Sequence, residues 1–198
     1  MNYFEDFCQK FKPLLTANEY KQNQYNRWAA FEFIAKELLE KNKPLTIIET
    51  GTLRAENDWL GYGHSTLMWD WIVSKTSGDV YSVDIDHDAI KFARPRCNNI
   101  KFIHCDSIGY LRSVEASKLD LLYLDSYNWS PQEHISSCLH HMTELGSIWD
   151  RLPSGCLVGV DDCHSETLGK HVLVNLFFEK LIKQKPLVNC HVQIWRKP

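Results

Sequence analysis

Short apolar runs alternate along this chain with longer segments in which apolar residues recur every three to four positions. The short runs have the length of buried strands, and the longer segments have the period of amphipathic helices. We expect strands at Leu45–Glu49, Val80–Asp84, Ile100–His104, Leu119–Leu124, Cys156–Val160 and Val188–Trp195, and helices near residues 65–76, 87–94, 107–116, 131–150 and 166–184. This alternation predicts an α/β protein: a three-layer α/β/α sandwich whose mostly parallel sheet has six to seven strands, with the final run as one strand at or near an edge.

A separate helical layer is expected before the first strand. Apolar side chains recur at helical spacing between residues 24 and 42, and Pro44 then ends the segment. The chain has no internal repeat and no low-complexity linker, so we expect one domain over residues 1–198, with a helical layer at residues 1–42 and a sheet core at residues 45–198. The layer is expected to pack near the mouth of the site that the strand ends form.

Acidic residues stand at or just after the ends of the five strands predicted to be parallel. They are Glu49, Asp84, Asp106, Asp125, Asp161 and Asp162. In an open parallel sheet these strand ends share one edge, and ligands bind there. Clustered carboxylates repel one another unless cations or hydroxyl donors stabilise their charge. The pattern therefore predicts a ligand site at this edge of the sheet.

Two motifs connect this edge to a known family. The first strand ends in Glu49-Thr50-Gly51-Thr52, and Gly63-His64-Ser65 precedes the next helix. A glycine lets the backbone approach a ligand closely, and a helix N-terminus attracts a carboxylate. From about Leu45 to its C-terminus the chain resembles the class I S-adenosylmethionine-dependent methyltransferases, which have a Rossmann-like fold. Within them it is most similar to the small metal-dependent O-methyltransferases of the catechol O-methyltransferase type and to the related cephalosporin hydroxylase-like group.

The resemblance implies an activity, a cofactor and a set of binding residues. The activity is O-methylation of a small hydroxylated acceptor by S-adenosylmethionine, assisted by Mg²⁺. The residues implied in cofactor binding are Glu49, Gly51, Thr52, Gly63, Ser65, Asp84, Asp106, Ser107 and Asp125. Among them Asp84 would bind the ribose hydroxyls, and Asp106 with Ser107 would line the adenine.

The implied catalytic and metal-binding residues follow the fourth and fifth strands. Asp125, Asp161 and Asp162 would hold Mg²⁺, an ion that prefers hard oxygen ligands. The catechol-type enzymes carry a lysine base three residues after the first of these, and this chain has Asn128 there. We therefore take Asp125 and His164 as candidate catalytic residues, since an imidazole with a pKa of about 6.5 suits a general base. The alternative for His164 is an exposed loop histidine.

Two further features carry expectations of their own. Residues 52–62 lengthen the first loop beyond the family's length, so they form a lid or a substrate-reading loop, or else a surface elaboration with Trp59 packed on the core. His140 and His141, within the long helix predicted after the fourth strand, are expected to be surface or packing residues.

Composition and charge narrow the choice of partners. The chain has 22 Lys and Arg against 25 Asp and Glu, a formal charge of −3, so it lacks the basic excess of a dedicated nucleic-acid or membrane-surface binder. No apolar run approaches the roughly 20 residues of a membrane span, and the N-terminus does not look like a secretory signal. The 7 cysteines form no Cys-x-x-Cys pair, which favours a reduced, cytoplasmic setting. We expect a small-molecule substrate and leave open whether the protein forms a homo-oligomer.

Two other functions compete with methyl transfer. A nicotinamide-dependent oxidoreductase of Rossmann type needs Gly-x-Gly-x-x-Gly directly after the first strand, and Glu49-Thr50-Gly51-Thr52-Leu53-Arg54 lacks it. A non-catalytic S-adenosylmethionine-binding module is favoured by the missing lysine. It is opposed by the three carboxylates of the implied metal site, because a mere sensor of the cofactor has no use for a cation that activates a substrate.

Overall fold

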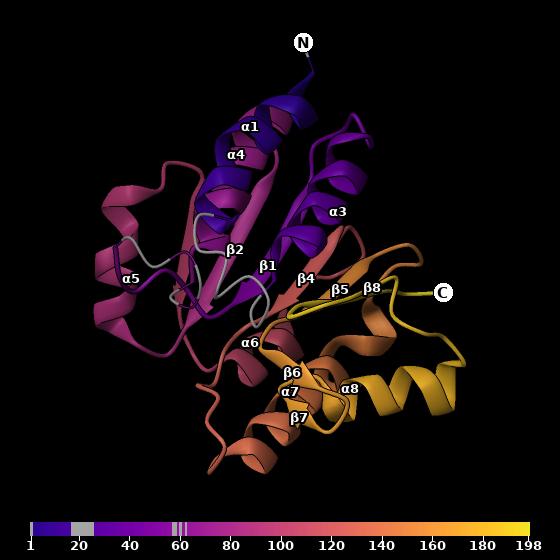
Figure 1. The fold of residues 1–198 in the computed structure, drawn as a ribbon. Coiled ribbons are helices and arrows are strands. Elements are labelled where there is room, and N and C mark those ends of the chain that lie inside the picture. Colours follow the sequence, from indigo (N-terminus) through magenta and orange to yellow (C-terminus); the bar gives the residue numbers. More distant parts are fainter. Residues whose placement is uncertain (1, 17–25, 57–58, 60, 62) are drawn as a thin grey trace.

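The computed structural model describes residues 2–16, 26–56, 59, 61 and 63–198. Its strands are β1 (Thr46–Thr50), β2 (Asp79–Asp84), β3 (Ile100–His104), β4 (Leu121–Leu124), β5 (Leu157–Val160), β6 (Cys163–Ser165), β7 (Leu168–Gly169), β8 (Val188–Asn189) and β9 (Gln193–Arg196). Seven of them form one sheet in the order β3-β2-β1-β4-β5-β9-β8 (Figure 1). β9 runs antiparallel to both of its neighbours, and β1 to β5 pair in parallel. The predicted α/β class and mostly parallel sheet are confirmed.

Helices cover both faces of this sheet. They are α1 (Tyr3–Thr16), α3 (Trp28–Leu39), α4 (Ser65–Thr76), α5 (His87–Ala93), α6 (Ser107–Ser113), α7 (His134–Ile148) and α8 (Val172–Phe177), with short 3-10 turns at Arg94–Arg96 and Trp149–Arg151 and a π turn at Phe178–Ile182. Neighbouring strand residues alternate between two apolar cores: Ile47 packs with α1, α3 and α4, and Ile48 packs with α6, α7 and α8. The result is the predicted three-layer sandwich (Figure 1).

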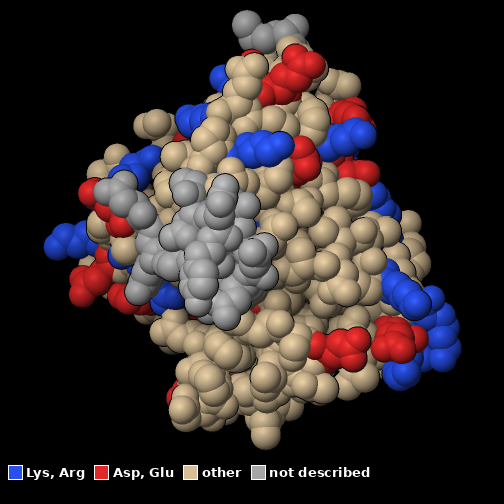
Figure 2. All heavy atoms as spheres, in the orientation of Figure 1, with Lys and Arg blue, Asp and Glu red and all other residues tan. Residues whose placement is uncertain are grey.

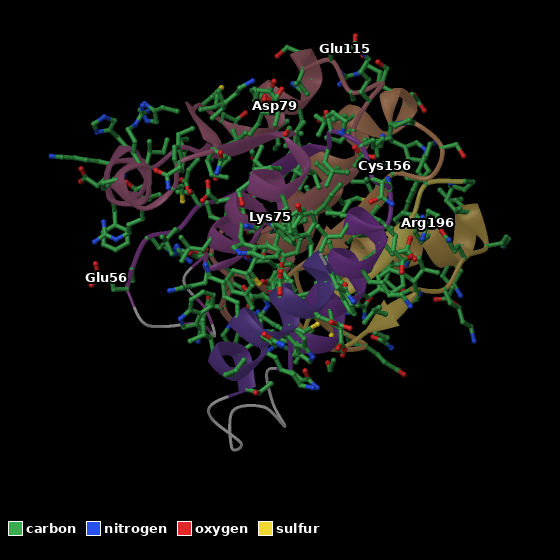
Figure 3. The ribbon with its side chains drawn as sticks, turned by 90° about the horizontal axis from the view of Figure 1, so that it is seen from above. Glu56, Lys75, Asp79, Glu115, Cys156 and Arg196 are labelled. Atoms are coloured by element: carbon green, nitrogen blue, oxygen red, sulfur yellow. The ribbon has the colours of Figure 1, made fainter. Side chains whose placement is uncertain are left out.

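The N-terminal helices share their apolar core with the sheet. Phe7, Phe11 and Leu15 of α1 and the apolar face of α3 are buried against β1 and α4. Figure 3, which looks down from above, shows these helices lying over the strands. The helical layer predicted before the first strand is thus present, although the predicted helix begins at Trp28 and residues 17–25 lie outside the described part of the chain.

Two predicted elements near the C-terminus are wrong. The run Val188–Trp195 is not one strand but the hairpin of β8 and β9, because the chain turns at residues 190–192. The helix expected over residues 166–184 begins only at Val172, and the residues before it form the small hairpin of β6 and β7. Gly169 has φ +126°, a backbone conformation that no helix contains, so the helical period of the sequence cannot extend through it.

The helix expected over residues 131–150 begins later than predicted. The backbone N–H of Glu133 donates to Ser130 Oγ at 3.2 Å, as a capping serine should, but the regular helix starts at His134. Among the described residues no helix is both long and apolar enough to cross a membrane. On the face shown in Figure 2, acidic and basic side chains are interspersed.

Candidate active site

A cavity of about 460 Å³ opens at the carboxyl ends of the parallel strands. Its volume lies in the range of small-molecule sites. Seven of the nine residues expected to bind the cofactor line it: Gly51, Thr52, Gly63, Asp84, Asp106, Ser107 and Asp125. The structure therefore brings together, from four strand ends, residues that are up to 74 positions apart in the sequence, from Gly51 to Asp125.

Glu49 and Ser65, the other two, do not line this cavity. The Glu49 carboxylate is buried and accepts hydrogen bonds from Ser65 Oγ at 2.5 Å, Thr66 Oγ1 at 2.6 Å, Trp69 Nε1 at 3.0 Å and Ser82 Oγ at 3.1 Å. Burial raises the pKa of Glu49 to about 8, although these donors act in the other direction. Glu49 thus joins the end of β1 to the start of α4 and to β2, and so holds the first loop in place.

Two glycines of the first loop stand where no side chain fits. Gly51 has φ +88°, and a Cβ there would lie 2.5 Å from the carbonyl oxygen of Asp125. Gly63 has φ +71°, and a Cβ there would lie 2.2 Å from the carbonyl oxygen of Thr52. The glycines allow the loop to fold against the end of β4, and this close approach forms the floor of the cavity.

The end of the cavity near Asp84 and Asp106 is acidic, and Ile85 adds an apolar side chain to it. Asp84 Oδ1 accepts from the Asp86 backbone N–H at 2.8 Å, and Asp106 Oδ2 accepts from the Gly109 N–H at 2.7 Å, so backbone donors orient both carboxylates. Burial raises the pKa of Asp84 above its ordinary value. Ile85, which the sequence analysis missed, lines the cavity with 73% of its surface exposed. The signal for Ile85 in the sequence was an apolar residue between Asp84 and Asp86, just after the second strand.

The three carboxylates predicted to bind metal also come together. Tyr123 OH donates to Asp161 Oδ2 at 2.8 Å. Arg27, at the start of α3, donates through Nε to Asp161 Oδ1 and through Nη2 to Asp162 Oδ1, both at 2.8 Å. Arg27 and Asp161 are buried. Although burial acts the other way, Asp161 and Asp162 raise the pKa of Arg27 above its ordinary value, so it stays charged.

A second buried cation, Lys170, lies on the other side of these carboxylates. Its Nζ is 2.7 Å from Asp125 Oδ1, 3.0 Å from Asp162 Oδ2 and 3.1 Å from the carbonyl oxygen of Ser126. His191 Nε2 lies 3.3 Å from Asp162 Oδ1. Although burial acts the other way, Lys170 and His191 help to hold the pKa of Asp162 well below its ordinary range.

The three carboxylates predicted to bind Mg²⁺ do not fit a divalent ion in addition to these two cations. The ammonium of Lys170 contacts two of the three predicted ligands, and the guanidinium of Arg27 contacts Asp161 and Asp162. A metal ion bound to the same oxygens would lie directly against both positive groups. Neither Arg27 nor Lys170 was predicted from the sequence. The available signal was the group of carboxylates itself, because clustered negative charges need positive charges nearby.

His164, the candidate base, lies on the wall of a different cavity. Its ring centroid is 3.8 Å from that of Trp129, and it borders a space of about 890 Å³ beside β6 and α8. Burial lowers the pKa of His164 to about 4, so its ring is neutral at neutral pH. Its ligand atoms come close to Asp162 and His191 rather than to the cofactor cavity. The catalytic role of His164 stays a prediction.

His140, expected to be a surface or packing residue, lines the cavity at the carboxyl ends of the strands. Its Nε2 lies 3.3 Å from Ser107 Oγ and 3.4 Å from Glu144 Oε1, and Ser126 Oγ donates to the same Glu144 oxygen at 2.7 Å. Although burial acts the other way, the hydrogen bond from His140 and the charge of His141 lower the pKa of Glu144 to about 2. This network couples the α6 wall of the cavity to the loop after β4.

The inserted loop makes contacts consistent with a lid or substrate-reading loop and also contacts consistent with a surface elaboration. Arg54 Nη1 donates to Asn128 Oδ1 at 2.5 Å, across the mouth of the cofactor cavity. Trp59 packs its ring 5.9 Å from that of Phe11 in α1. Glu56, labelled at the periphery in Figure 3, pairs with Arg96. The predicted loop positions 57, 58, 60 and 62 lie outside the described residues.

Several solved structures that are similar to this one are methyltransferases. A methyltransferase from Geobacter sulfurreducens matches over 98% of this chain and 93% of its own, with a TM-score of 0.58 and 14% identity. The MycE methyltransferase of the mycinamycin biosynthetic pathway, in complex with Mg and S-adenosylhomocysteine, matches over 83% of this chain at a TM-score of 0.56 and 13% identity. This chain spans 48% of MycE.

A third match is SMU.1697c from Streptococcus mutans, in complex with S-adenosylhomocysteine. It covers 84% of this chain and 97% of its own, with a TM-score of 0.54 and 16% identity. No protein-family model and no curated protein sequence matches the chain. The chain thus has the fold of class I S-adenosylmethionine-dependent methyltransferases, as its motifs predicted.

Proposed function

We propose that this protein is an S-adenosylmethionine-dependent methyltransferase that methylates a hydroxyl oxygen of a small molecule. The observation that carries the proposal is the gathering of seven predicted cofactor residues around one cavity at the carboxyl edge of the sheet. Methyltransferases with the same fold, two of them in complex with S-adenosylhomocysteine, support it. The first loop lacks the Gly-x-Gly-x-x-Gly motif that a nicotinamide cofactor needs, whereas Asp84 alone is compatible with either cofactor.

The cofactor supplies a methyl group on a sulfonium sulfur, and the protein must hold the acceptor oxygen in line with it. Asp84 and Asp106, each oriented by a backbone N–H, would hold the ribose and adenine. The close turns at Gly51 and Gly63 would let the backbone lie against the methionine part. Positioning of this kind can supply about 7–11 kcal/mol of the barrier.

Asp125 is the residue best placed to face the acceptor. It lines both the cofactor cavity and a smaller cavity beside it, which Phe31, Met68 and Asp161 also border. A carboxylate at that junction can accept the hydrogen bond of an acceptor hydroxyl and orient its oxygen toward the methyl group. His164 remains the second candidate for removing the proton. The Mg²⁺ that the sequence resemblance implies is left out of the proposal, because Lys170 and Arg27 hold the carboxylates.

Calorimetric titration with S-adenosylmethionine and S-adenosylhomocysteine tests the cofactor, and a screen of small hydroxylated aromatic compounds for release of S-adenosylhomocysteine tests the reaction. Binding together with turnover is the expected result. Binding of the cofactor without turnover on any acceptor would favour the non-catalytic module. Absence of binding would reject both.

A further inference from the structure

We propose that Lys170 is a built-in cation that takes the place of the divalent ion at the acceptor end of the site, so that methyl transfer by this protein needs no metal. Only the claim that methyl transfer needs no metal rests on the proposed function. The claim that Lys170 occupies the place of the ion concerns metal binding alone, and it is tested without cofactor. It excludes the Mg²⁺ site that the sequence resemblance implies.

The geometry around Lys170 is that of a cation site already filled. An ammonium has three N–H donors, and Lys170 has three acceptors within hydrogen-bond distance: Asp125 Oδ1, Asp162 Oδ2 and the Ser126 carbonyl oxygen, at 2.7, 3.0 and 3.1 Å. Two of these belong to predicted metal ligands. The residue is 1% exposed, so water does not compete for its donors.

The charge balance of the cluster also indicates that the cation site is already filled. When all three are ionised, Asp125, Asp161 and Asp162 carry three negative charges, and Lys170 and Arg27 contact them with two positive charges. The described cluster is therefore close to neutral without an ion. Adding a divalent ion would reverse its sign and set that ion against two buried cations that cannot move into water.

The backbone fixes Lys170 in this position. Its N–H donates to the carbonyl oxygen of Asp162 at 3.1 Å, so the same residue receives both the backbone and the side chain of the lysine. Gly169 makes the turn that allows this, since a Cβ there would lie 2.4 Å from that Asp162 oxygen. Lys170 is buried and fixed by its backbone, so its side chain cannot simply rotate into solvent to make room for an ion.

Replacing the ion by an ammonium also changes what the acceptor must be. A Mg²⁺ ion keeps open positions that can bind two neighbouring oxygens of one acceptor. The donors of Lys170 are all directed at protein oxygens, so Lys170 acts through Asp125, which it orients at the junction of the two cavities. We therefore infer an acceptor that presents a single hydroxyl, without need of an adjacent pair.

The test compares Mg²⁺ binding in four proteins by calorimetry and thermal unfolding, in the absence of cofactor; Mg²⁺ is the probe because it prefers oxygen ligands to the imidazoles of His164 and His191, which lie near Asp162. The wild type should show no Mg²⁺ binding. Lys170→Met should bind Mg²⁺ roughly tenfold or more tighter than the wild type, because it leaves the carboxylates without their cation. Lys170→Met with Asp162→Asn should lose that gain. Lys180→Met, which removes an exposed lysine paired with Glu179, should behave as the wild type.

Mg²⁺ binding by the wild type, or loss of its turnover in EDTA that Mg²⁺ restores, would overturn the proposal. So would a folded Lys170→Met that gains no metal binding. If Lys170→Met does not fold, Lys170→Gln and the wild-type titration decide. If the wild type fails to bind S-adenosylmethionine, the proposed function falls, and the metal titrations still decide whether Lys170 replaces the ion.

Discussion

Lys170 binds Asp162 twice, through its backbone N–H to the Asp162 carbonyl oxygen at 3.1 Å and through its ammonium to the Asp162 carboxylate at 3.0 Å. Asp162 itself has φ +51°, a conformation uncommon for residues with a side chain. The two contacts hold this strained turn directly beside the proposed reaction site. The end of β5 is therefore shaped by a residue that lies directly after the small hairpin of β6 and β7.

Replacing Asp84 by Ala should weaken binding of S-adenosylmethionine by about 1.5–3 kcal/mol, the range for a hydrogen bond to a charged group. Calorimetric titration measures the change. Asp79→Ala is the matched control, because Asp79 stands at the other end of the same strand in an exposed pair with Lys101. Equal affinities of the two variants would remove Asp84 from the cofactor site.

Gly51→Ala should destabilise the fold by about 2–5 kcal/mol, since a left-handed backbone and a clash with the Asp125 carbonyl oxygen act together. Gly155→Ala separates the two causes. Gly155 has φ +86°, nearly the same as Gly51, but a Cβ there meets nothing within 4 Å. Urea unfolding of both variants should show the larger loss for Gly51→Ala; equal losses would mean that the close approach to β4 has no cost.

Glu49 should make stability fall as the pH rises. Its pKa of about 8 in the folded protein lies above the ordinary 4.5, so between these values the folded state binds more protons than the unfolded state. Its contribution is complete below pH 4.5 and is lost as the pH passes through 8, a change on the order of a few kcal/mol.

Glu49→Gln keeps a neutral group of the same shape and should remove this slope. The difference between the unfolding free energies of wild type and variant, measured from pH 5 to 8, isolates Glu49 from the other titrating groups. Parallel curves for the two proteins would mean that the Glu49 carboxylate is ionised throughout, held by its four donors.

His164→Ala should slow methyl transfer less than tenfold, because His164 lines the neighbouring cavity and not that of the cofactor. Removal of a true general base costs about 10²–10⁴ in rate. The rate should be measured on an acidic phenol with cofactor affinity as a control. A loss of 10² or more with unchanged cofactor binding would assign the base to His164.

The parts of the fold that rest on buried, continuous apolar runs could be predicted from the sequence. The strands Leu121–Leu124 and Leu157–Val160 lie inside the predicted runs, because every residue of both strands is buried. The hairpin of β8 and β9 was missed because its turn at residues 190–192 contains none of the glycine or proline signals that usually mark one.

The residues of the site also divide into those that could be located from the sequence and those that could not. Residues that act at the ends of strands, such as Asp84 and Asp125, could be located from the sequence because parallel strands bring their ends together. Arg27 and Lys170 could not, since nothing local marks either one: Arg27 precedes an ordinary helix, and Lys170 lies in a segment with the apolar period of a helix. Only the tertiary fold shows which cations the carboxylates meet.

The pair of Arg27 and Asp161 joins positions 134 residues apart, and that of Lys170 and Asp125 joins positions 45 apart. A ribosome makes the chain from its N-terminus, so Arg27 emerges long before the carboxylates that will hold it. Contacts of such long range form late, because the loops between them must close first. The acidic cluster thus meets both of its cations only after the chain has been made as far as Lys170 and the segment around that residue has docked.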